Sequence, residues 1–150
     1  MKIWVDADAC PKGIKEILFR VADRTGIDVV FVANMWLRLP ESPHISFVQV
    51  EAGPDIADDK IHEECTKGDL VITADIPLAA RVVEKQALAI DPRGTVYDQN
   101  NIGQILGMRN FMDELRGSGV ETGGPKSFGN KEKQKFANEL DKILMRAGRG

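Results

Sequence analysis

Three aspartates in this sequence lie within three residues after hydrophobic runs, near the points where strands should end. Asp6 and Asp8 come after the apolar run 3–5, and Asp75 follows the run 70–73. In open parallel sheets, ligands bind outside the carboxyl ends of the strands, so carboxylates at these positions are placed for chemistry. Crowded carboxylates repel one another and lose hydration, and a divalent cation offsets both costs. The pattern therefore predicts an acidic metal site at the strand ends.

A helix expected over residues 54–65 adds three more aspartates, Asp55, Asp58 and Asp59, at i, i+3 and i+4 spacing. This spacing places the three carboxylates on one helix face, while the apolar residues of the helix turn the other way. The helix macrodipole is a second explanation, because it stabilises acids near a helix N-terminus without any metal. It accounts well for Asp55, partly for Asp58 and poorly for Asp59, and we therefore favour the metal interpretation.

The candidate metal ligands share one chemistry, because all of them are carboxylates: Asp6, Asp8, Asp55, Asp58, Asp59 and Asp75. Oxygen ligands without histidine or thiolate favour Mg²⁺ or Mn²⁺ over zinc or copper. Thr73 lies two residues before Asp75 and is in position to orient an acid or a water. Its β-branched side chain is equally expected in a strand from propensity alone.

Four basic residues are candidates for contacts with substrate phosphates: Arg81, Arg109, Arg116 and Lys126. Scattered basic residues on helices are also typical of a solvated surface, so each of them has an ordinary alternative explanation. The two histidines, His44 and His62, are isolated in the sequence, and we interpret them as solvated.

The two cysteines, Cys10 and Cys65, form no CxxC pair and have no nearby histidines in the sequence. This pattern argues against a disulfide framework and against a zinc site, and it predicts free thiols. Cys10 lies near an expected helix N-terminus, which can lower the pKa of a thiol. Because no base is apparent for it, a nucleophilic role is not assigned.

Strands and helices alternate along the first 90 residues. Apolar runs predict strands at residues 2–5, 29–32, 45–50, 69–73 and 87–90. Helices are expected after Pro11, Pro54 and Pro77, since proline is favoured in a first helical turn, and Gly26 should end the first of them. This alternation is typical of an α/β fold with a mainly parallel sheet.

The last third of the chain has a different character. Helices are expected over residues 100–116 and 131–146, separated by a Gly-rich stretch at 117–129. We expect the two helices to cover the sheet and the stretch between them to be the one candidate for a mobile flap.

Length and composition predict a single domain spanning residues 1–150. The 43% hydrophobic and 29% charged residues are ordinary for a globular protein, and neither a signal peptide nor a membrane span is recognisable, so a cytoplasmic protein is expected. The net charge of −3 is unevenly distributed, with an acidic first half and a basic second half. Such an arrangement suits a phosphate-bearing substrate beside bound cations, and it is equally common on solvated surfaces.

Four ordered motifs carry a resemblance to a known family: IWVDADACP at 3–11, GDLVITADIPLA at 68–79, IDPRG at 90–94 and TGGP at 122–125. Over nearly its whole length the chain closely resembles the YaiI/YqxD family of small bacterial proteins, which is itself of uncharacterised function. Two positions depart from the family pattern. Gln86 stands where glycine is usual, and Glu132-Lys133 stands where Asp-Arg is usual.

The YaiI/YqxD family in turn looks like a branch of the PIN-like superfamily of metal-dependent nucleases. This resemblance implies a three-layer fold with a central, mainly parallel sheet flanked by helices. It matches Asp6 to the acid at the end of the first strand, Asp75 to the acid after the fourth, and the aspartates of the 54–65 helix to acids on an intervening helix. Asp8 joins the site only if the first strand ends at Asp6.

The leading functional hypothesis is a Mg²⁺- or Mn²⁺-dependent nuclease acting on nucleic acid, with RNA favoured by superfamily analogy, and Asp6, Asp59 and Asp75 as its catalytic residues. One alternative is a non-catalytic RNA-binding or regulatory module. Another is a phosphatase of the haloacid-dehalogenase kind, with Asp6 as nucleophile and Asp8 as general acid. Against this phosphatase stand the absence of room for a cap domain and the position of Asp69 before its strand instead of after it. The oligomeric state is left open.

Overall fold

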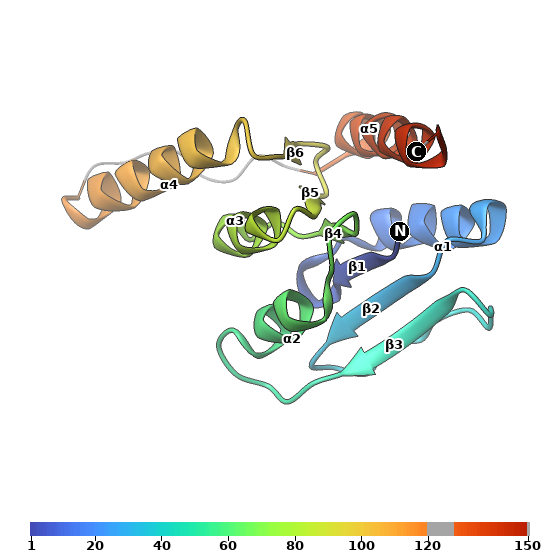
Figure 1. The fold of residues 1–150 in the computed structure, drawn as a ribbon. Helices are drawn as coiled ribbons and strands as arrows, with labels where there is room; N and C mark the ends of the chain where they lie inside the picture. The colour runs from blue at the N-terminus through green and yellow to red at the C-terminus, as the bar shows by residue number, and fades with distance from the viewer. Residues whose placement is uncertain (120–127, 150) are drawn as a thin grey trace.

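A six-stranded sheet forms the centre of the computed structural model, which describes residues 1–119 and 128–149 (Figure 1). The strands are β1 (Ile3–Asp6), β2 (Val29–Ala33), β3 (Ile45–Gln49), β4 (Leu70–Ile72), β5 (Leu88–Ile90) and β6 (Val96–Tyr97). Their spatial order is β3-β2-β1-β4-β5-β6; β1 to β5 are parallel to one another, and only β6 runs antiparallel to its neighbour β5. The predicted α/β class with a mainly parallel sheet is confirmed.

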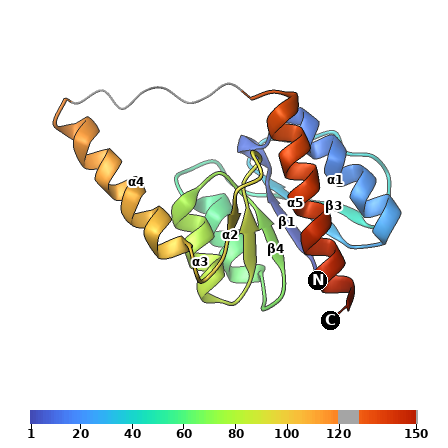
Figure 2. The same ribbon diagram turned by 90° about the horizontal axis from the view of Figure 1, so that it is seen from above.

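Helices cover both faces of this sheet and produce three layers (Figures 1 and 2). They are α1 (Lys12–Thr25), α2 (Ile56–Glu64), α3 (Ile76–Glu84), α4 (Ile102–Gly117) and α5 (Asn130–Arg149), with a short 3-10 helix η1 (Ala7–Ala9) after β1. Helices α1 and α5 lie on one face, and α2 and α3 lie on the other. No helix in the described part of the chain is both long and apolar enough to cross a membrane.

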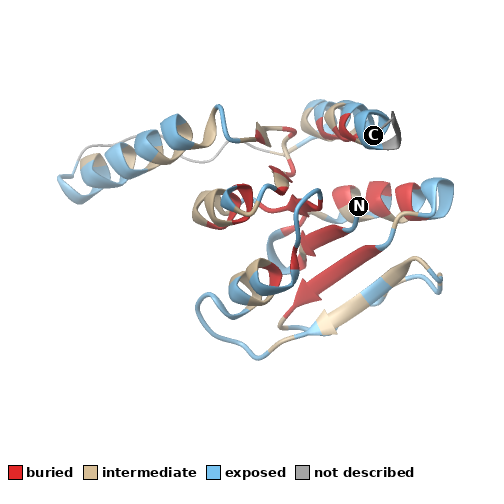
Figure 3. Ribbon diagram, viewed as in Figure 1, coloured by how far each residue is buried: buried red, intermediate tan, exposed pale blue. Residues whose placement is uncertain are grey.

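Because side chains along each strand alternate between the two faces of the sheet, a hydrophobic core lies on each face. In β1, Ile3 and Val5 point to the face of α1 and α5, where Phe136 of α5 is fully buried. Trp4 between them points to the opposite face, toward α2 and α3. Successive side chains of a strand point to opposite faces, and β2 and the first three residues of β1 are buried and hydrophobic because helices cover both sides (Figure 3).

The helix boundaries follow the expected signals closely. Gly26 ends α1 in the left-handed conformation with φ 72°, and its N–H donates to the carbonyl of Ala22. Pro77 lies in the first turn of α3, as predicted. Gln86 has φ 67°, a left-handed conformation that glycine would adopt without steric cost.

Strand β6 was not predicted, and it exists because of a turn organised by Asp91. Oδ1 of Asp91 accepts hydrogen bonds from the N–H groups of Arg93 and Thr95, at 2.9 and 3.0 Å, and folds the chain back along β5. Gly94 in this turn has φ 92°, and a Cβ atom there would lie 2.9 Å from the backbone of α5. Glycine is therefore required for α5 to pack against the turn.

The two closing helices behave differently, and the expectation that both cover the sheet is wrong for α4. Helix α5 contributes fully buried residues to the core, whereas α4 has no buried residue. Only Ile102 and Ile105, near its start, pack against the body. The remainder of α4 extends away from the domain and exposes Met108 and Phe111 (Figure 2).

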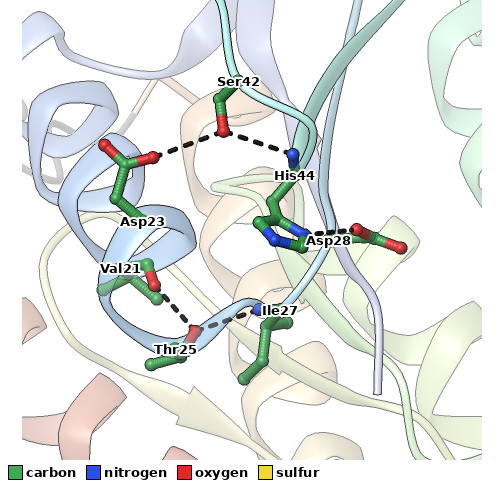
Figure 4. Close-up of polar contacts among 7 residues, drawn as sticks. All are labelled: Val21, Asp23, Thr25, Ile27, Asp28, Ser42 and His44. Carbon is green, nitrogen blue, oxygen red and sulfur yellow. Dashed lines mark hydrogen bonds and ion pairs between the residues drawn. The ribbon is translucent and has the colours of Figure 1, made fainter.

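Side-chain hydrogen bonds secure the edge of the sheet where β2 and β3 begin (Figure 4). Ser42 Oγ donates to Asp23 of α1 and accepts from the N–H of His44. The ring of His44 in turn contacts Asp28 Oδ1 at 3.2 Å, so this histidine is paired and not merely solvated. Thr25 Oγ1 caps the end of α1 in the same region. These contacts stabilise the end of the sheet where the strands begin, opposite to the carboxyl ends of the strands, where the candidate site lies.

Candidate metal centre

The candidate site lies where the direction of chain progression across the sheet reverses. From β1 the chain moves outward to β2 and β3, and β4 then pairs with the other side of β1. In such sheets the crevice at the carboxyl ends of the two strands flanking the reversal is the usual ligand site. Asp6 is the last residue of β1, and Thr73 and Asp75 follow β4. The predicted strand-end acids are therefore neighbours at this crevice.

Thr73 connects the two strand-end acids. Its hydroxyl donates to Asp6 Oδ2 at 2.9 Å and accepts from the N–H of Asp75 at 3.0 Å, and the residue is 1% exposed. Asp75 is the N-cap of α3, where its Oδ1 accepts from the N–H of Leu78 at 3.0 Å. The positive end of the helix dipole stabilises a carboxylate there. Both acids are thus held by bonds that leave further carboxylate oxygen capacity for a ligand.

Asp58 of α2 is the third acid of the site. Its side chain shares a hydrogen bond with that of Asp75, and the pKa of Asp58 is raised to about 7, first by burial and then by Asp75, Asp6 and Asp55. The pKa of Asp6 is also raised, mainly by burial and further by Asp75 and Asp8, against the lowering effect of the Thr73 hydrogen bond. We call Asp6, Asp58 and Asp75 the acidic cluster.

Helix α2 places Asp58 beside Asp75 because the opposite side of the helix packs into the core. Ile61 and Cys65 are fully buried against the sheet. Asp55 precedes the helix with φ 63°, a left-handed conformation that aspartate tolerates better than most residues, and its carbonyl accepts from the N–H of Asp59 at 2.8 Å. This turn sets the start, and hence the orientation, of α2.

The aspartates that were predicted to share one face of α2 lie in two different environments. Whereas Asp58 contacts Asp75, Asp59 forms an ion pair with Arg81 of α3 at 2.9 Å. Arg81 also contacts Nδ1 of His62 at 3.2 Å, and burial together with the charge of Arg81 lowers the pKa of His62. Although Asp58 and Asp59 were expected on the same helix face, they therefore have different partners.

Asp8 meets the condition set for it from the sequence, because β1 does end at Asp6. The following residues form η1, and Asp8 Oδ2 accepts a hydrogen bond from the N–H of Asn34, just after β2, at 2.9 Å. Asp8 also acts electrostatically on Asp6. It therefore forms the rim of the site on the β2 side.

The donor set fits a hard divalent cation. Among the described residues, no three His, Cys, Asp or Glu side chains are already arranged closely enough to hold a metal ion. However, Asp58 and Asp75 can share a hydrogen bond only while one of them carries a proton, and a cation can replace that proton between the same oxygens. The structure thus brings together carboxylates whose mutual repulsion a Mg²⁺ or Mn²⁺ ion would relieve.

The predicted phosphate contacts are not gathered at the acidic cluster. Arg109 and Arg116 both pair with Asp113 along the projecting helix α4. Arg81 pairs with Asp59, as described above. Lys126 and most of the Gly-rich stretch lie outside the described residues.

Two features of the structure were missed or misjudged from the sequence. Asp69, 7% exposed, accepts hydrogen bonds from the backbone N–H and Oγ1 of Thr66, from the N–H of Lys2 and from Nε1 of Trp4. Three of these four hydrogen bonds go to Oδ2 of Asp69, and their donors belong to Thr66 and Trp4. Because Trp4 is 65 residues away from Asp69, no local sequence pattern predicts this bond. Burial raises the pKa of the Cys10 thiol to about 12, so the helix N-terminus does not activate it.

Replacing Asp58 by asparagine should stabilise the metal-free protein at pH 8 by about 1–2 kcal/mol and change little near pH 4. The folded-state pKa of Asp58, about 7, lies above its ordinary value of 3.8. Ionisation therefore favours the unfolded chain, and stability is lost as pH rises from 3.8 to 7. The full shift would correspond to several kcal/mol, and solvent around this partly buried group reduces it.

Urea unfolding in chelator at pH 4, 6 and 8 measures this effect, with Glu63→Gln on the same helix as the control. The asparagine amide can still donate to Asp75, so the hydrogen bond is retained. A variant that is less stable than wild type at pH 8 would show that Asp58 is not repelled by its neighbours.

Comparison with known proteins places the chain in a family. The family model for uncharacterised proteins of the YaiI/YqxD family matches residues 4–146. Relatives named only UPF0178 protein are similar over almost the entire chain. The relative from Shewanella pealeana is 57% identical over 144 residues, covering 96% of this chain and 95% of its own length. The relatives from Pseudoalteromonas atlantica and Syntrophotalea carbinolica are 56% and 57% identical, and 98% and 99% of their lengths are covered. No solved structure matches the chain significantly. The protein therefore belongs to the YaiI/YqxD family, whose members are described as uncharacterised.

Proposed function

We propose that this protein is a Mg²⁺- or Mn²⁺-dependent nuclease that hydrolyses phosphodiester bonds, with RNA as the expected substrate. The observation that carries the proposal is the convergence of Asp6, Asp58 and Asp75 from three different elements at the switch point of the sheet. The resemblance to the PIN-like superfamily, whose acids occupy corresponding elements, supports the reaction class by analogy.

The acidic cluster would hold the metal ion, with Asp8 and Asp55 at its rim. When bound, the cation would act as a Lewis acid that lowers the pKa of water and offsets the charge of the phosphodiester. We assign to Asp58 the catalytic role that the sequence suggested for Asp59, since the carboxylate of Asp59 is engaged by Arg81 at 2.9 Å.

The surrounding residues would keep the cluster in position. The Thr73 hydroxyl fixes one oxygen of Asp6, and the N-terminus of α3 fixes one oxygen of Asp75. When the pH is below its pKa of about 7, Asp58 mostly carries a proton, and a cation must displace this proton in order to bind. Metal affinity, and with it activity, should therefore increase as the pH rises through 7.

Incubation of the purified protein with labelled single-stranded RNA, single-stranded DNA and duplexes, in Mn²⁺, Mg²⁺ or chelator, tests the proposal. We expect cleavage of RNA in Mn²⁺ and none in chelator. Asp75→Asn purified in parallel controls for contaminating nucleases. Failure to cleave any of these nucleic acids while Mn²⁺ binds would refute the nuclease assignment. Metal-independent RNA retention would then support the binding module, and turnover of small phosphate esters would support the phosphatase.

A further inference from the structure

Two large apolar side chains stand in solvent close to the candidate site. Met35 and Trp36 are each 71% exposed, more than any other large hydrophobic side chain among the described residues. Single exposed apolar residues are normal on protein surfaces, but two adjacent ones, including a tryptophan, leave considerable apolar area in water. The other tryptophan, Trp4, is 6% exposed.

The segment that carries them is held in place and not simply loose. At its start, the N–H of Asn34 donates to Asp8 Oδ2 at 2.9 Å, and its carbonyl accepts from Nε2 of Gln49 at 3.3 Å. Further along, Leu37 and Leu39 pack against the core on the α1 face. These anchors on both sides leave the side chains between them, which include the exposed Arg38, directed outward.

The anchors also place this segment next to the acidic cluster. Asp8, which binds Asn34, is the same carboxylate that acts on Asp6. The path from the cluster runs from Asp6 to Asp8, across the hydrogen bond to Asn34 and on to Trp36. Each of its two steps of two residues spans at most about 7 Å, so the whole path is at most about 15–18 Å. That is about the rise of five nucleotides along a stacked strand. An oligonucleotide with a phosphate at the cluster would therefore have bases within reach of the indole.

We propose that Met35 and Trp36 form a stacking platform for the bases of a single-stranded nucleic acid, with Arg38 contacting a neighbouring phosphate. The proposal deepens the proposed function, on which it rests, by specifying a single-stranded substrate. An exposed indole stacks on any base, and a guanidinium binds phosphate well. Bases inside a duplex are already stacked on one another and are not open to this contact. Two side chains are also far too small a surface for a stable protein partner, which needs about 1,000 Å².

Binding of a fluorescein-labelled 12-nucleotide uridine oligomer in chelator and low salt tests the platform without cleavage. We expect Trp36→Ala to weaken binding about 10-fold, within the range found when a stacking aromatic is removed. Trp36→Phe should recover most of the affinity because it keeps an aromatic face. Phe111→Ala, which removes an exposed aromatic side chain from the projecting helix α4, is the matched control and should bind like wild type.

Three results would overturn the platform: no binding of the oligomer by the wild type, equal binding by Trp36→Ala, or binding of the matching duplex as tight as that of the single strand. Failure of the platform is distinguishable from failure of the nuclease. Cleavage that depends on Asp75 but not on Trp36 would refute only the platform. Binding that depends on Trp36 without any cleavage in Mn²⁺ would refute only the nuclease. If the exposed side chains bind a protein instead of nucleic acid, oligomer binding will not depend on Trp36. This result also refutes the platform.

Discussion

Asp75→Asn is expected to lower metal-dependent RNA cleavage by about 100- to 1,000-fold while the protein remains folded. The loss corresponds to the several kcal/mol of transition-state stabilisation that a correctly held metal ion supplies. Asparagine is as good an N-cap as aspartate, so its carbonyl can still accept from the N–H of Leu78 and α3 keeps its start. Asp6→Asn should behave alike, because its carbonyl can still accept from Thr73.

Single-turnover cleavage rates, with circular dichroism to verify folding, measure these losses. Glu16→Gln, which removes an exposed acid from α1, is the charge-matched control. Asp58→Asn should also cost more activity than Asp59→Asn, since Asp58 contacts Asp75 within the cluster whereas Asp59 is paired with Arg81. Wild-type rates in Asp6→Asn and Asp75→Asn would contradict the assignment of the site, and the reverse order of Asp58 and Asp59 would restore the role first inferred for Asp59.

Asp69→Ala should destabilise the protein by about 3–4 kcal/mol, although Asp69 lies outside the candidate site. Its two buried oxygens accept four hydrogen bonds, which join β1, the start of β4 and the turn at Thr66. Hydrogen bonds to a charged group contribute about 1.5–3 kcal/mol each, and alanine would leave several donors without a partner. For a chain of this size, the loss should lower the melting temperature by about 6–16 °C.

Urea unfolding and thermal melts measure the effect of Asp69→Ala. Asp69→Asn should be milder, because one oxygen remains to accept from Trp4 and Thr66. Asp23→Ala is the control, since Asp23 is exposed and accepts a single long bond from Ser42 at 3.3 Å. A cost below about 1 kcal/mol for Asp69→Ala would show that this network contributes little. Cleavage per folded molecule should be unchanged by it, which separates this structural acid from the catalytic ones.

The parts of the structure that follow from local pattern were predictable from the sequence. Apolar runs of strand length located β1 to β5, and the alternation with helices predicted a mainly parallel sheet. The rule that ligand sites lie at strand ends predicted from the sequence that Asp6 and Asp75 are neighbours, because Asp6 directly follows one such run and Asp75 lies two residues after Thr73. Thr73 was recognised as a residue able to orient an acid, and its hydroxyl does contact Asp6.

The parts that depend on how distant elements dock were not predictable. Asp58 and Asp59 are adjacent in sequence, and which of them faces Asp75 depends on the way Ile61 and Cys65 seat α2 on the sheet. Asp69 receives its bond from Trp4 across 65 residues. Helix α4 has apolar residues at helical spacing, yet most of them do not reach the core.

Thermal melting of the wild-type protein with and without Mn²⁺ tests the central claim, that the acidic cluster is a metal site. At a Mn²⁺ concentration about 100 times the dissociation constant, binding should add about 2.7 kcal/mol. For this size of protein, that gain raises the melting temperature by about 5–10 °C. The rise should be larger at pH 8 than at pH 6, where Asp58 retains its proton in the absence of metal. Asp6→Asn should show little rise at either pH. A wild type that does not gain stability from saturating Mn²⁺, or an Asp6→Asn variant that gains as much, would contradict the metal site.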